Sequence, residues 1–185
     1  MRFAALVLPL MALAGCAASQ TSISRVEIGN RYEPTEQGYL GGAEAILPTA
    51  IWNNPLPEAA TSWRQILTQY RPGTPLSFVP LDQVAEDRRR HRFVMLFAPP
   101  VTMTDSSICA LTDAPPAAEE GQGPYRWRAA YCVGDRTINE AVGQLATKPA
   151  IGADSMAPVL PELALSLFPL VNPHMKNERC LVPGC

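Results

Sequence analysis

Charged residues, histidines and long apolar runs are all scarce in this sequence of 185 residues. Only 17% of the residues are charged, against about 25% in typical soluble chains. The formal net charge is −2, which argues against a nucleic-acid-binding protein with a strongly basic surface. No apolar stretch approaches the roughly 18 residues of a membrane-spanning helix, so the sequence does not predict a protein with several spans.

Recognisable catalytic and metal-binding patterns are missing as well. The two histidines, His91 and His174, have no serine or cysteine nucleophile at a familiar offset, and there is no Gly-x-Ser-x-Gly elbow. No Cys-x-x-Cys pair, phosphate-binding loop or dinucleotide fingerprint occurs. From this pattern we expect no catalytic residue, no metal and no cofactor, although periplasmic hydrolysis stays open as an alternative.

The N-terminus has the pattern of an export signal. Arg2 provides a basic start, and an apolar stretch of about ten residues follows it. Small residues then lead to a cysteine in the run Leu13-Ala14-Gly15-Cys16. This run resembles the lipobox of bacterial lipoproteins, whose signal is removed before the cysteine. The resemblance implies that residues 1–15 are a signal peptide.

In that family the cysteine receives a diacylglyceryl group and its new amine is acylated, for example with palmitate, so Cys16 is the expected lipid anchor. Several acyl chains anchor a protein stably, whereas one alone is marginal. Ala17 stands where many Gram-negative lipoproteins carry the Asp that retains them in the inner membrane. We therefore expect the outer membrane, on its periplasmic face. The proline- and arginine-rich composition also resembles that of uncharacterised proteobacterial lipoproteins.

Four cysteines remain after Cys16, and an even number in an exported chain suggests disulfides. Three connectivities are open. Nearness in sequence favours Cys109–Cys132 together with Cys180–Cys185. The first bridge would stabilise the fold by about 3 kcal/mol in the chain-entropy model.

Glycines and prolines interrupt residues 16–57 often, so we expect a lipidated tether followed by a Pro-rich, irregular lead-in. A single domain is expected over residues 58–185. Apolar spacing and end charges predict helices over residues 58–70, 80–90, about 137–148 and 157–168. Strands are predicted over residues 92–98 and 125–133, with 76–79 and 101–110 as further candidates. This order favours an α+β or small α/β fold with about four helices and two or more strands.

Two polar clusters are candidate contact sites. Arg88, Arg89, Arg90 and Arg92 form the densest charged run, which could meet an acidic partner or lipid phosphates. Asp135 and Arg136 follow Gly134 at an expected strand-to-helix junction, a common place for ligands.

The leading hypothesis is a lipid-anchored, non-catalytic envelope protein that acts as an accessory, assembly or scaffold component through protein contacts. The arginine run and the long 99–124 loop are its expected contact surfaces. The alternative is a periplasmic small-ligand binder or hydrolase that uses the Gly134–Arg136 junction.

Overall fold

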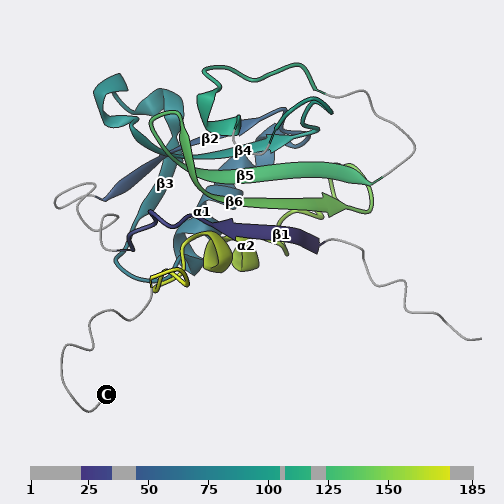
Figure 1. Ribbon diagram of the computed structural model, residues 1–185. Coiled ribbons are helices and arrows are strands. Elements are labelled where there is room, and N and C mark those ends of the chain that lie inside the picture. The colour runs from purple at the N-terminus through teal and green to yellow at the C-terminus, as the bar shows by residue number, and fades with distance from the viewer. Residues whose placement is uncertain (1–21, 35–44, 105–106, 118–123, 176–185) are drawn as a thin grey trace, which may run out of the picture.

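The computed structural model describes residues 22–34, 45–104, 107–117 and 124–175. In these residues six strands form one mixed sheet in the order β1-β6-β5-β4-β2-β3 (Figure 1). The strands are β1 (Ser22–Ile28), β2 (Ile46–Trp52), β3 (Ser77–Pro80), β4 (His91–Phe97), β5 (Tyr125–Val133) and β6 (Arg136–Leu145). The helices are α1 (Ala60–Tyr70) and α2 (Leu160–Leu167), with 3-10 turns η2 (Pro57–Ala59), η3 (Leu81–Gln83), η4 (Glu86–Arg88) and η5 (Ile108–Ala110).

The sheet has a parallel and an antiparallel part. β2 pairs in parallel with both β3 and β4, and α1 makes the crossover between β2 and β3. From β4 onward the pairing is antiparallel through β5 and β6 to β1. β4 therefore lies inside the sheet, as its continuous apolar sequence predicted.

Both faces of the sheet are covered, and the main core lies under the two helices (Figure 1). Trp63 of α1 and Leu163 of α2 are fully buried against sheet residues such as Phe93, Trp127 and Tyr131. A smaller apolar cluster lies on the opposite face. Neither helix in the described chain has the length and apolar character needed to cross a bilayer.

Five of the expected elements are confirmed. The first helix ends at Tyr70 as predicted, and the apolar run beginning near Arg92 is β4. The alternating segment Tyr125–Val133 is β5, with Trp127 and Tyr131 on the helix-covered face. The candidate strand at 76–79 is β3, and the last helix is α2.

The expectation of about four helices is wrong, because the described residues hold a six-stranded sheet and two α-helices. Residues 80–90 form two separate 3-10 turns, since Ala85 is extended (φ −58°, ψ 145°) between them. That helix prediction depended on charges at its ends rather than on an apolar stripe. The candidate strand at 101–110 is not formed either, since its described part holds turns and η5.

The segment after Gly134 is strand β6 and not a helix. Gly134 has a φ of +59°, which suits the tight turn that joins β5 directly to β6. Ile138, Ala141 and Leu145 all pack against the main core, because the pairing with β5 skips Ile138 and thereby shifts the alternation of β6. Such a bulge breaks the period of two, so the apolar residues are spaced as they would be in a helix.

The expected irregular lead-in contains two strands, β1 and β2. Pro48 lies inside β2, where a missing amide hydrogen would normally be unfavourable. The pairing of β2 with β4 begins only at Thr49, so Pro48 lies just before the ladder that would need its N–H. The frequent prolines therefore did not exclude a strand here.

Replacing Gly143 of β6 with alanine should destabilise the fold. An added Cβ would lie closer than 3.0 Å to the indole ring of Trp127 and to the carbonyl oxygen of Ser22. We expect the free energy of unfolding, measured by urea denaturation, to fall by about 1–3 kcal/mol, the usual cost of overpacking. In a Trp127→Phe background the same change should cost less, because the indole atoms that clash are gone. Strictly additive costs would contradict this packing argument.

Candidate functional site

A segment that follows β4 covers the second face of the sheet. We call residues 99–104 and 107–117 the cover segment. Ile108 and Cys109 of this segment are fully buried in the smaller core, where Met103 and Leu111 also pack. A disulfide joins Cys109 to Cys132 on β5, which confirms the first expected pairing. Cys16, Cys180 and Cys185 lie outside the described residues, so their expected roles stay predictions.

Arg128 and Glu140 form an ion pair beneath this segment. The two atoms Arg128 Nε and Glu140 Oε1 are 2.9 Å apart, and the side chains are 7% and 4% exposed. Arg128 Nη1 also donates to the carbonyl oxygens of Met103 (3.4 Å) and Thr104 (3.0 Å). Glu140 is thus the counter-ion of a buried arginine.

Arg92 is a structural residue rather than a surface contact. Its guanidinium donates to the carbonyl oxygen of Cys109 and lies 4.0 Å from Asp135 Oδ1. Burial lowers the pKa of Arg92, and the Asp135 carboxylate partly opposes that shift. Arg92 thus connects β4 to the cover segment on one side and to the β5–β6 turn on the other.

The other three arginines of the run differ in their exposure and contacts. Arg88 and Arg90 are exposed, whereas Arg89 Nε donates to the carbonyl oxygen of Val84 at 2.6 Å. The exposed carboxylates Glu86 and Asp87 precede Arg88 directly. This surface therefore carries mixed charge, and Arg88 and Arg90 are the members of the run left free to meet a partner.

The expected ligand junction at Asp135 and Arg136 is the tip of a β-hairpin. Asp135 is in the turn with its side chain 86% exposed, and Arg136 pairs with Val133 as β6 begins. The helix start that would have supplied free amides to an anion is absent at this described position. The helical geometry on which that ligand prediction depended is therefore not formed at residues 134–136.

The histidines are held by contacts of their own. His91 Nδ1 lies 2.8 Å from the hydroxyl oxygen of Tyr131, and the two rings pack at 6.1 Å. Burial, together with the charge of Arg90, lowers the pKa of the His91 imidazole below its ordinary value. The backbone N–H of His174 donates to the side chain of Asn172. The two histidines thus lie in separate contacts.

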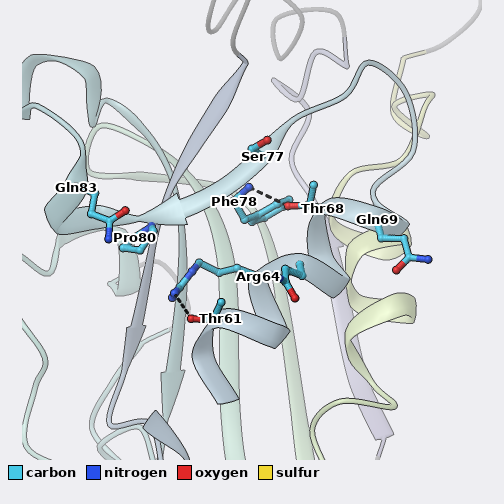
Figure 2. A pocket seen from close by; sticks show the side chains of 9 residues that line it. Thr61, Arg64, Thr68, Gln69, Ser77, Phe78, Pro80 and Gln83 are labelled. Carbon is cyan, nitrogen blue, oxygen red and sulfur yellow. Dashed lines mark hydrogen bonds between the residues drawn. The ribbon is translucent and has the colours of Figure 1, made fainter. Parts of the chain in front are cut away.

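A groove of about 500 Å³ lies between α1 and strand β3, and it is a candidate binding site (Figure 2). Thr61, Arg64, Gln65, Thr68 and Gln69 line it from α1, and Ser77, Phe78, Pro80 and Gln83 line it from β3 and the turn after it. Only Arg64 among these nine side chains is charged. Its Nη2 donates to Thr61 Oγ1 at 3.3 Å, as Figure 2 shows.

Sequence reasoning missed this groove. The apolar stripe of α1 was found, but its polar side was not matched to a neighbour. The signal was present in the amides and hydroxyls of residues 61–69. These side chains line a groove only because β3 lies beside α1, and the topology of the fold decides that placement.

Within the described residues, no group of three or more histidine, cysteine, aspartate or glutamate side chains could hold a metal ion. Comparison with protein-family models, with curated proteins and with solved structures found no match to this chain.

Removing Glu140 should destabilise the protein strongly, because it leaves Arg128 charged and buried without its carboxylate. We expect Glu140→Leu to lower the free energy of unfolding by about 3–5 kcal/mol, as measured by urea denaturation. The double variant Arg128→Met/Glu140→Leu should cost less than the single one. Glu27→Leu, in an exposed pair with Arg25, is the control and should cost under about 1 kcal/mol. Equal losses for both glutamates would contradict the argument.

Proposed function

We propose that this chain is a lipid-anchored, non-catalytic protein of a Gram-negative cell envelope. It binds another envelope component as an accessory or scaffold protein. The observation that carries the proposal is the buried Cys109–Cys132 disulfide, because such bonds form and persist in oxidising compartments. The run Leu13-Ala14-Gly15-Cys16 supports the lipid anchor, and Ala17 favours the outer membrane.

The buried polar side chains contact other parts of the protein, and this supports a binding role over a catalytic one. Arg92, Arg128 and Glu140 hold the cover segment and the strands together, and His91 contacts Tyr131. Catalytic groups must instead reach a substrate within hydrogen-bond distance. The exposed Arg88 and Arg90, and the outer side of the cover segment, are the surfaces proposed to meet a protein partner.

Changing Cys16 to serine tests the anchor. We expect the wild-type chain to incorporate a labelled fatty acid and to sediment with outer membranes. Cys16→Ser should lose the label and leave the membrane fraction, because no acyl chain remains to hold it. The matched control Cys180→Ser should keep both properties. Membrane association of Cys16→Ser equal to that of the wild type would overturn the lipid-anchor proposal.

A second candidate function is the binding of a small polar ligand in the groove between α1 and β3. Glutamine, threonine and serine side chains there can donate to and accept from hydroxyl and amide groups. Arg64 adds one positive charge in a groove whose lining includes no carboxylate. This chemistry suits an amide-bearing sugar or peptide with one carboxylate, as found in cell-wall fragments.

Thermal unfolding with soluble cell-wall fragments tests the groove. We expect the fragments to raise the melting temperature of the wild-type protein, because a ligand that binds only the folded state stabilises it. Arg64→Ala should abolish this rise, whereas Arg31→Ala, at an exposed arginine outside the groove, should retain it. An equal rise in both variants would place binding elsewhere.

A further inference from the structure

The two edges of the sheet differ in what they offer to another chain. At β3 the backbone N–H of Ser77 points toward the neighbouring strand and donates to the carbonyl oxygen of Ala45. Because successive residues of a strand alternate in direction, the N–H of Phe78 points away from the sheet. The hydroxyl oxygen of Thr68 accepts this outward N–H at 3.0 Å. Pro80, at the next outward position, has no N–H to donate. The β3 edge is thus protected against strand addition.

Among the residues that the structure describes, none protects the β1 edge in this way after residue 24. The backbone N–H of Gly29 donates to the carbonyl oxygen of Ile138, so it points toward β6. Pairing is regular from Arg25 to Ile28, and therefore alternation places the N–H and C=O groups of Val26 and Ile28 on the open edge. No proline interrupts β1, and Val26 is 37% exposed. This edge is a template for one more strand.

The charge order of β1 is complementary to itself. Arg25 and Glu27 lie on the same face of the strand, on either side of Val26, and their side chains are 44% and 58% exposed. If a second β1 runs antiparallel with Val26 opposite Val26, each Arg25 lies opposite Glu27 of the other copy. The Val26 pair would be hydrogen-bonded, so the Arg25–Glu27 pairs beside it would be non-hydrogen-bonded pairs. Side chains lie closest together in such pairs, and opposite charges are therefore favoured there.

The surroundings of Glu27 favour an added cation. Glu27 is in register with Glu140 on β6, so the two glutamates are cross-strand neighbours on one face of the sheet. Glu140 is paired with Arg128, and Glu27 with Arg25 of its own strand at 3.3 Å. A second Arg25, from another copy, would give Glu27 a cation on its open side.

We propose that β1 is the docking edge for a second copy of this chain. The two β1 strands pair antiparallel about a two-fold axis at Val26, and the sheet continues from one copy into the other. Val26 N–H donates to the carbonyl oxygen of Val26 in the second copy, and the reverse bond is equivalent by symmetry. A partner strand of another protein is the competing occupant, and the test distinguishes it.

Disulfide crosslinking of the full-length chain in its own membrane tests the register. Val26→Cys should give a dimer under mild oxidation, because the two Cα atoms lie about 5.5 Å apart in such a pair. Ser22→Cys is the matched control on the same strand. Its two copies would be about 27 Å apart, beyond the reach of a disulfide. Equal yields from the two cysteines, or a crosslinked product that contains a different protein, would overturn the proposal.

Charge exchange in the Val26→Cys background tests the self-complementarity. Arg25→Glu alone places two glutamates opposite each other in both of the symmetric 25–27 pairs, so we expect about tenfold less dimer. Glu27→Arg places two arginines opposite each other in both pairs, and we expect the same loss. The double variant Arg25→Glu/Glu27→Arg restores opposite charges and should restore the yield. Both residues are exposed, so folding is preserved. A double variant as poor as the single ones would overturn the two-fold pairing.

Discussion

The Arg128–Glu140 ion pair is the interaction on which the second face of this sheet depends. Two charges on neighbouring strands are almost fully removed from water, and such a pair is costly unless its remaining hydrogen bonds are satisfied. The carbonyl oxygens of Met103 and Thr104 accept from Arg128, so the cover segment completes the pair. The pair and its cover are therefore mutually dependent: the segment excludes water, and the arginine holds the segment.

Two further connections hold the same segment near its centre. The Cys109–Cys132 disulfide ties it covalently to β5, and Arg92 donates to the carbonyl oxygen of Cys109. At its far end, Asn53 Nδ2 donates to the carbonyl oxygen of Pro115 at 3.0 Å. The described part of this connection is thereby fixed, with the 3-10 turn η5 as its one short helical element. Its inner side belongs to the core, so contacts with a partner are restricted to its outer side.

This arrangement separates the surfaces that remain for binding. The groove between α1 and β3 offers neutral hydrogen-bonding groups and Arg64, and it lies next to the protected sheet edge. The open β1 edge lies at the other end of the sheet. A ligand in the groove and a second copy at β1 would thus occupy opposite ends of the sheet.

Elements whose pattern is local were predictable from the sequence. The apolar stripe ending at Tyr70 identified α1, and the unbroken apolar run of β4 and the alternation of β5 identified two central strands. The pairing of Cys109 with Cys132 followed from their nearness in sequence. The proposed anchor at Cys16 also depends on local sequence alone, in residues outside the described structure.

Only the tertiary structure decided the elements whose character depends on distant neighbours. β6 has a helix-like apolar spacing because a bulge at Ile138 shifts its alternation, and β2 accepts Pro48 because its ladder with β4 begins one residue later. Glu140 is recognised as a buried counter-ion only when β6 is placed beside β5. These assignments depend on which strands become neighbours, and the sequence of one strand does not specify the strands that pair with it.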